Sequence, residues 1–145
     1  MVSVREIAAG QELGPVVVDV DRSRLVAYAA ASGDHNRIHW DERFARSVGL
    51  PDVIAHGMWT MGAACALVCE WAGDSGAVLD YRTKFTAPVV VPYDGGARIE
   101  VRGVVAKVTV GTAEGPATAV VELTVTCAGE KVLTRAQARV RLGGG

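Results

Sequence analysis

The sequence predicts an α+β protein in which an antiparallel sheet wraps around one long helix. Its first half reads as a single strand followed by helices and loops, whereas its second half contains runs in which apolar and polar residues alternate. Alternation with a period of two residues is typical of strands that bury one face. One strand, a helical section and then a group of strands is an order typical of α+β folds.

The first half begins with a strand at residues 16–20, which are almost all valine. Asp21 or Ser23 can cap the helix that follows, because their side-chain oxygens accept hydrogen bonds from the first free N–H groups. The Ser-Gly-Asp sequence at residues 32–34 ends this helix. A second short helix is expected from about residue 41 to 48.

The longest helix is expected from about residue 58 to 71, near the middle of the chain. Its central positions carry small side chains, namely those of Gly62, Ala63, Ala64 and Ala66. Because small residues occur on nearly every side, this helix suits close enclosure by a sheet.

The second half reads as about four antiparallel strands. Residues 99–102, 121–126 and 135–142 alternate between apolar and polar side chains, and residues 81–85 form another expected strand. Turn signals separate these runs at residues 93–96, 114–116 and 128–130.

Composition restricts the classes of function. The chain has 145 residues, is 50% hydrophobic, and carries 15 Lys and Arg against 16 Asp and Glu. This hydrophobic content excludes a disordered chain, and the net charge of −1 gives no general reason to bind nucleic acid or an anionic membrane. The longest apolar run, residues 61–69, is too short to cross a bilayer.

These features predict one cytoplasmic domain over residues 1–142, followed by a flexible glycine tail at residues 143–145. The N-terminus has no basic-then-apolar signal pattern. The chain has three cysteines and no Cys-x-x-Cys pair, which argues against a disulfide framework and against a zinc ribbon.

The three histidines, His35, His39 and His56, fall within a window of 22 residues. Asp34 precedes them in a polar, irregular stretch that we expect to be a loop. Asp34 and His39 lie five positions apart, so a carboxylate and an imidazole can converge across a turn and move protons. The alternative is that Asp34 caps the following helix while His39 is only a packing residue.

His56 and Gly57 lie just before the expected central helix. The N-terminus of a helix presents unpaired N–H groups and a positive partial charge, and Gly57 has no side chain to block an approaching group. Its N–H can therefore bind a carbonyl oxygen that becomes negative during a reaction, as an oxyanion hole does. The alternative is an ordinary glycine at a tight junction between loop and helix.

A metal site is the weaker interpretation of the same histidines. His35 and His39 are four residues apart, and His56 could supply a third ligand. However, Gly33 and Asn36 argue against a continuous helix there, and no Cys or Glu lies nearby at a ligand spacing. We therefore expect no metal.

Other reactive or charged side chains have simpler interpretations. Cys65 and Cys69 share one face of the central helix and are expected to be small core residues. Arg82 and Lys84 share one face of the strand at residues 81–85, where they either meet water or bind phosphate groups at the mouth of a pocket.

Three segments together resemble the MaoC-like, or (R)-specific, enoyl hydratases and dehydratases. Residues 28–39 end in Ser-Gly-Asp-His-Asn-Arg-Ile-His, similar to the family's Ser-Gly-Asp-x-Asn-Pro-Ile-His. Residues 54–61 contain the family's Ala-His-Gly-Met, and residues 84–89 are similar to its Arg-Phe-x-x-Pro-Val strand. The resemblance is nearest to the short 3-hydroxyacyl-thioester dehydratase subunits of actinobacteria, which have a single domain.

This resemblance implies a single hot-dog fold and a dimer whose substrate tunnel runs near the interface. It implies that Asp34 and His39 are the catalytic pair and that Gly57 is the oxyanion-hole glycine. Asn36 matches the loop residue that supports the pair, and His56 is a further supporting or substrate-binding candidate. The implied substrate is an acyl-CoA or acyl carrier protein thioester, with neither a metal nor a redox cofactor.

The chain departs from the family pattern at two positions. Arg37 stands where proline is usual, which removes a rigid φ restraint and adds a charge beside the loop. Arg37 therefore either contacts an acidic or polar acyl chain or points to solvent. Lys84 stands where arginine is usual, and it lacks the planar fork of a guanidinium group.

The predicted reaction is the reversible addition of water to a trans-2-enoyl thioester, which gives an (R)-3-hydroxyacyl thioester. One alternative is an acyl-thioester hydrolase on the same type of fold. Another is a subunit of a heterodimeric dehydratase that needs a second hot-dog subunit for activity, or that only completes the tunnel of its partner.

Overall fold

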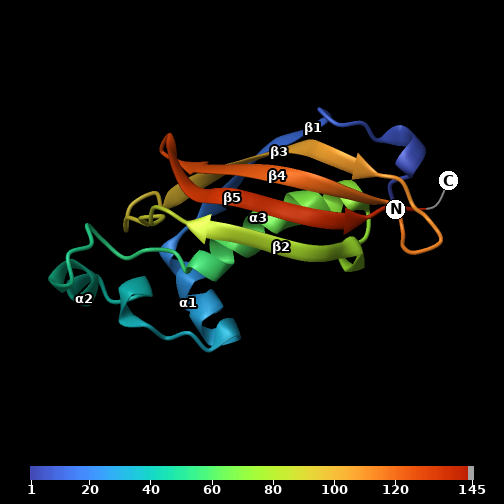
Figure 1. Ribbon diagram of the computed structural model, residues 1–145. Coiled ribbons are helices and arrows are strands. Elements are labelled where there is room, and N and C mark those ends of the chain that lie inside the picture. Colours follow the sequence, from blue (N-terminus) through green and yellow to red (C-terminus); the bar gives the residue numbers. More distant parts are fainter. Residues whose placement is uncertain (144–145) are drawn as a thin grey trace.

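A five-stranded antiparallel sheet curves over one long helix, α3 (Gly57–Ala72), as Figure 1 shows. The structure is a computed structural model and describes residues 1–143. The strands follow the spatial order β1-β3-β4-β5-β2, so β1 and β2 are the edges of the sheet. This arrangement confirms the predicted α+β class and the predicted order of one strand, helices and four further strands.

The strands are β1 (Glu12–Val20), β2 (Val78–Phe85), β3 (Ala97–Thr109), β4 (Thr118–Cys127) and β5 (Glu130–Arg141). Two shorter helices, α1 (Arg22–Ser32) and α2 (Glu42–Ser47), accompany α3, and single 3-10 turns form η1 (Val4–Glu6), η2 (Arg37–His39) and η3 (Ser75–Ala77). The strands are longer than alternation predicted, because the hydrogen-bonded ladder continues past the alternating runs.

The ends of the short helices follow from local sequence. Asp21 caps α1 by accepting the Arg24 N–H, while the Ser23 hydroxyl donates to the same carboxylate. Gly33 ends α1 in the left-handed region, at φ 76°. Asp41 caps α2 by accepting the Phe44 N–H.

The central helix α3 lies against all five strands. The side that faces the sheet is buried and carries Thr60, Ala64, Leu67, Val68 and Ala72. The opposite side is open, with Met58 61% exposed and Gly62 and Ala66 also exposed. The predicted sheet around a central helix is therefore confirmed, and this curved sheet covers one side of α3.

Residues 21–56 leave the sheet after β1 and form α1, η2 and α2 beside one end of it (Figure 1). The guanidinium group of Arg22 fastens this excursion to the scaffold. Its Nε donates to the carbonyl oxygen of Val91 at 2.6 Å, and its terminal nitrogens lie 2.7 Å from Asp52 Oδ1 and 3.4 Å from Glu42 Oε2. Nothing in the sequence pattern indicated this contact.

The N-terminal residues and Gly143, the last residue that the structure describes, lie side by side at the other end of the molecule (Figure 1). Gly143 forms a bridge with Ser3, and its N–H donates to the carbonyl oxygen of Val2 at 3.0 Å. Gly143 therefore belongs to the folded part, whereas the rest of the expected tail, residues 144–145, lies outside the described residues. No helix in the described part of the chain is long and apolar enough to span a membrane.

Candidate active site

The loop after α1 places the carboxylate of Asp34. The Asp34 N–H donates to Ser32 Oγ at 3.2 Å, and Asp34 Oδ1 accepts the Asn36 N–H at 3.1 Å. The residue that caps the next helical turn is Asn36, whose Oδ1 accepts the Ile38 N–H at 3.2 Å. Asp34 is thus not the cap that the simpler interpretation expected, and its second oxygen is available to other groups.

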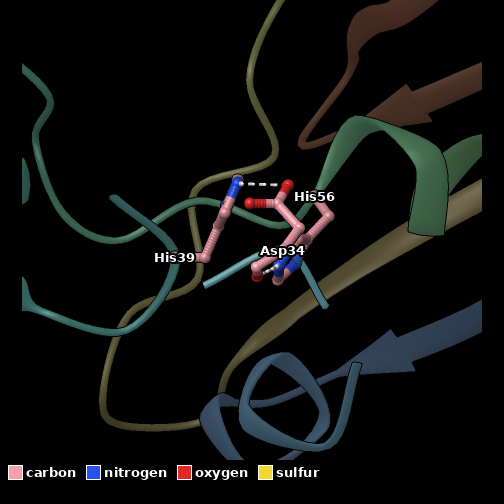
Figure 2. A group of neighbouring side chains, drawn as sticks. All are labelled: Asp34, His39 and His56. Carbon is pink, nitrogen blue, oxygen red and sulfur yellow. Dashed lines mark hydrogen bonds and ion pairs between the residues drawn. The ribbon is translucent and has the colours of Figure 1, made fainter. Parts of the chain in front are cut away.

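His39 ends η2 with its imidazole buried. Its Nδ1 lies 2.7 Å from the carbonyl oxygen of Ile54, so this nitrogen carries the proton of the neutral ring and donates it. The lone pair of Nε2 then faces Asp34 Oδ2 across 3.8 Å, as Figure 2 shows. Burial lowers the pKa of His39 below its ordinary value of 6.5, against the opposing effects of the Ile54 hydrogen bond and the Asp34 charge.

His56 lies beside the same pair (Figure 2) and is only 2% exposed. Its ring stacks on that of His39 with 3.7 Å between the ring centroids, and Tyr28 packs against it at 4.7 Å. Its Nε2 lies 3.0 Å from the carbonyl oxygen of Asp34. His56 is therefore in contact with both members of the predicted pair.

Gly57 is the first residue of α3, and its position is fixed by pairing of the backbone just before it. The Ala55 N–H donates to the carbonyl oxygen of Val89 at 2.9 Å, and the Val91 N–H donates to that of Val53 at 2.9 Å. His56, the residue that precedes the helix, makes no side-chain hydrogen bond to it. Among the described residues no acceptor is found for the Gly57 N–H, as is general for the first turn of a helix.

His39 and Gly57 line one cavity of about 430 Å³, so one member of the predicted catalytic pair and the predicted oxyanion donor face a common space. The remaining lining is largely apolar: Ile38, Ile54, Ala55, Thr60, Phe85, Thr86, Ala87, Pro88, Val89, Val132 and Leu133. Such a lining suits a hydrocarbon chain with one polar group at the helix N-terminus.

The donor atoms of Asp34, His39 and His56 lie within 4.8 Å of one another, as the ligands of a metal ion do. Their orientation does not fit such a site. The planes of the two imidazoles are only 20° apart in the stack, so their in-plane lone pairs run side by side and do not converge on one point. Each ring also has one nitrogen within hydrogen-bond distance of a backbone carbonyl oxygen.

Arg37, the candidate for contact with the acyl chain, is directed elsewhere. Its Nε and Nη2 donate to Asp41 Oδ2 at 3.1 and 2.8 Å, and its guanidinium carbon lies 4.4 Å from the centre of the Phe44 ring. Arg37 does not line the cavity that contains His39 and Gly57. Its charge is matched by Asp41 within the excursion.

The remaining candidates lie away from this cavity. Arg82 and Lys84 border a larger hollow of about 730 Å³ on the outer face of the sheet, and Arg82 pairs with Asp80 at 2.7 Å. Cys65 and Cys69, expected to be small core residues, are half-buried on α3. Burial raises the pKa of the Cys65 thiol, which keeps it protonated at neutral pH.

Three residues near the site received no role from the sequence. Thr60 and Phe85 line the cavity, and Tyr28 packs against His56. A Cβ atom added at Gly57 would lie 3.0 Å from the Phe85 ring, so the absence of a side chain at Gly57 makes room for that ring. Phe85 lies in one of the segments that carried the family resemblance, which was the available signal.

Two relatives show what the chain is similar to in sequence. The 3-hydroxyacyl-thioester dehydratase X of Mycobacterium tuberculosis is 36% identical over 80 residues, which are 55% of this chain and 28% of that protein. A solved structure of a MaoC-like dehydratase is 39% identical with a TM-score of 0.92, covering 98% of this chain and 42% of that one. The chain thus spans less than half the length of both relatives.

The fold also matches that of a smaller protein over its whole length. The (R)-hydratase from A. caviae involved in PHA biosynthesis aligns with a TM-score of 0.82, covering 96% of this chain and 99% of that one, at 22% identity. The model of the MaoC like domain matches residues 6–125. The chain therefore belongs to the family of MaoC-like domains, and its sheet over α3 is the hot-dog fold of that family.

Proposed function

We propose that the chain is an (R)-specific 3-hydroxyacyl-thioester dehydratase and trans-2-enoyl-thioester hydratase. One observation carries the proposal. The Asp34 carboxylate and the lone pair of His39 Nε2 lie 3.8 Å apart, beside an apolar cavity that the N-terminal residue of α3 also lines. The part of this chain proposed to carry the reaction is its hot-dog domain, residues 1–142. We also propose that it works in the cytoplasm.

In the hydration direction, the acyl chain occupies the cavity and the thioester oxygen accepts the Gly57 N–H. A water molecule between Asp34 and His39 gives a proton to His39 Nε2 while its oxygen forms a bond to C3. The electron pair of the C2=C3 bond moves toward the thioester oxygen, where the helix N-terminus stabilises the negative charge. The proton held on His39 Nε2 then passes through Asp34 to C2, the C=O bond of the thioester forms again and His39 is neutral once more; dehydration is the reverse sequence.

The division of roles between Asp34 and His39 is the assignment that fits their surroundings best. His39 is neutral because it is buried and donates from Nδ1, so its Nε2 can accept a proton. Asp34 is 53% exposed and keeps one oxygen directed to His39.

The test is a hydration assay with a short trans-2-enoyl-CoA, followed by the loss of the conjugated enoyl absorbance. We expect Asp34→Asn and His39→Ala each to lower kcat by about 100-fold or more, the usual contribution of a positioned acid or base. His35→Ala and Asp94→Asn are matched controls, because both side chains are exposed and lie outside the cavity lining. Activity that survives both site substitutions would contradict the mechanism.

The same assay separates hydration from the competing thioester hydrolysis. A thiol reagent added to a parallel sample detects free CoA, which only hydrolysis releases. Enoyl absorbance that disappears without release of thiol supports the hydratase, and release of thiol with retention of the C2=C3 bond identifies a hydrolase.

We further propose that the active unit is a dimer, formed either by two copies of this chain or with a second hot-dog subunit. Two unpartnered surfaces support this proposal: the edge strand β2 and the open side of α3, where Met58, Gly62 and Ala66 are exposed. The solved MaoC-like dehydratase chain is more than twice as long as this one, so an additional segment accompanies the matched part there.

A further inference from the structure

The buried side chain of His56 connects the three parts of the proposed site. It contacts Asp34 in the loop after α1, stacks on His39 in η2, and immediately precedes Gly57 at the start of α3. Its ring is 2% exposed and does not line the substrate cavity. His56 therefore reaches the reacting groups only through other residues.

The tautomer of His56 follows from its contact with Asp34. A carbonyl oxygen can only accept, so the nitrogen 3.0 Å from the Asp34 carbonyl oxygen must carry a proton. The other nitrogen, Nδ1, is buried and has no hydrogen-bond partner among the described residues. In a neutral ring this Nδ1 holds a lone pair that nothing satisfies.

A purely structural role does not explain this arrangement. A phenyl ring would fill the space between His39 and Tyr28 without leaving a buried nitrogen unpaired, which costs free energy. What a phenyl ring lacks is the Nε2–H that holds the Asp34 carbonyl. A histidine is therefore needed here for one hydrogen bond, from His56 Nε2–H to the carbonyl oxygen of Asp34, which lies 22 residues earlier in the sequence.

We propose that His56 is a positioning residue. Its Nε2–H holds the Asp34 backbone, and its ring supports His39, so that the carboxylate, the imidazole and the Gly57 N–H keep one geometry. This inference rests on the proposed hydratase function. Displacements of about 1 Å at such groups can cost about 100-fold in rate.

Two variants separate the effect of the His56 hydrogen bond on kcat from the effect of its ring. His56→Phe keeps a flat ring and removes the N–H, whereas His56→Gln keeps an N–H donor at a similar reach and removes the ring. We expect His56→Phe to lower kcat about 10- to 100-fold with KM unchanged, because His56 does not line the cavity. We expect His56→Gln to recover part of that loss. An unchanged kcat in His56→Phe, or equal losses in the two variants, overturns the proposal.

Val68→Ala controls for a general loss of stability. Val68 is fully buried in α3, the helix that follows His56, and it does not line the cavity. The melting temperature of His56→Phe should stay near that of the unaltered protein, while Val68→Ala should melt lower and keep its kcat. If His56→Phe melts at a clearly lower temperature and its loss of kcat is no larger than its loss of folded protein, His56 merely supports the fold.

A measurement without substrate tests the contact itself. In nitrogen-15 NMR of the unaltered protein, His56 should appear as the Nε2–H tautomer with a proton that exchanges slowly with water. A rapidly exchanging proton, or the opposite tautomer, overturns the inference whether or not the protein hydrates enoyl thioesters. If the spectrum is as expected and the hydration assay is negative, the proposed function fails and the contact stands.

Discussion

The tautomer of His39 follows from a single hydrogen bond. Because Nδ1 donates to the carbonyl oxygen of Ile54, the lone pair is on Nε2, which faces Asp34. Burial disfavours the charged ring and lowers the pKa of His39 below 6.5. The environment thus keeps this imidazole ready to accept a proton under neutral conditions.

The first prediction concerns the acid side of the pH–rate profile. Since the base must be unprotonated, kcat/KM should stay high as the pH falls through 6.5 and decline only below the lowered pKa of His39. The profile is measured with the enoyl-CoA assay between pH 5 and 8. A decline centred above pH 6.5 would contradict the assignment of His39 as the base.

The lowered pKa of His39 also makes the free energy of unfolding depend on pH, and it does so in a definite direction. The unfolded chain protonates this histidine near pH 6.5, whereas the folded chain resists protonation, so the unfolded state binds more protons in that range. The contribution of His39 to the free energy of unfolding is present above pH 6.5 and is lost as the pH falls. Denaturant unfolding of the unaltered protein and of His39→Ala, each measured at pH 5 and at pH 8, isolates this contribution.

At the scale of single residues, the sequence indicated which residues of the candidate site lie close together but not several of their contacts. The structure brings Asp34, His39 and Gly57 to one place, as the spacing and the resemblance predicted. The direction of the Arg37 side chain could not be predicted in the same way. It depends on contacts with Asp41 and Phe44, and neither residue was a candidate for the site. The bond from His56 to the Asp34 backbone joins distant parts of the chain and has no local signal.

The N-terminus of α3 is the element on which the proposed chemistry depends most. Helix dipoles and free N–H groups concentrate positive charge there, and Gly57 presents one such N–H to the cavity. Proline is tolerated at the first position of a helix because the missing N–H is not needed for the helix itself. This tolerance allows a donor to be removed from an otherwise intact element.

The prediction for this element compares Gly57→Pro with Gly57→Ala. Both add a Cβ atom that would lie 3.0 Å from the Phe85 ring, but only proline removes the N–H. We expect the kcat of Gly57→Pro to be about 100-fold or more below that of Gly57→Ala, the usual effect of losing one oxyanion-hole donor. Equal kcat values in folded samples of the two variants would exclude the Gly57 N–H as the oxyanion donor.

The sequence predicted the type of each helix and strand well, and its first and last residues less well. Caps such as Asp21 and stops such as Gly33 are local signals, so the start and end of α1 could be read from the sequence. β2 begins three residues before the expected strand, because its ladder with β5 includes positions without clear alternation. The small residues of α3 indicated close packing but not how much of the helix the sheet covers.

At the scale of the whole molecule, one side of α3 and the outer edges of both edge strands of the sheet, β1 and β2, have no partner within the described part of the chain. The strand β2 bonds to β5 on one side only, and unpaired strand edges favour association with another strand. The exposed Met58, Gly62 and Ala66 give α3 an apolar, closely approachable side. Together these surfaces suit a second hot-dog domain.

The prediction at this scale is a solution mass of twice the 15.2 kDa of one chain. Ala66→Glu places a charge on the open side of α3 and should reduce the mass to that of one chain while the fold persists. Ala106→Glu, on an exposed position of β3, is the matched control and should leave the dimer intact. Light scattering after gel filtration measures the mass. A dimer that persists in Ala66→Glu would place the interface elsewhere, and a single chain in the unaltered protein would point to a different partner subunit.

The overall class could be predicted because it depends on the order of elements along the chain, which periodicity reveals. The order of strands in space could not. β2 pairs with β5 and not with β3, the next strand in sequence. That pairing arises from how the sheet closes over α3 and depends on contacts among residues far apart in sequence.

The attachment by Arg22 has a consequence for how the protein loses activity. The excursion that carries Asp34 and His39 is tied by this guanidinium group to Val91, at the edge of the scaffold, and to Asp52 and Glu42 within itself. The backbone pairs of Ala55 with Val89 and of Val53 with Val91 hold it as well, and segments at the margin of a domain open at a lower free energy than its core. Release of the excursion would separate the reacting pair from the helix N-terminus while the sheet stays folded. Loss of the proposed activity and denaturation of the sheet would then be distinct events.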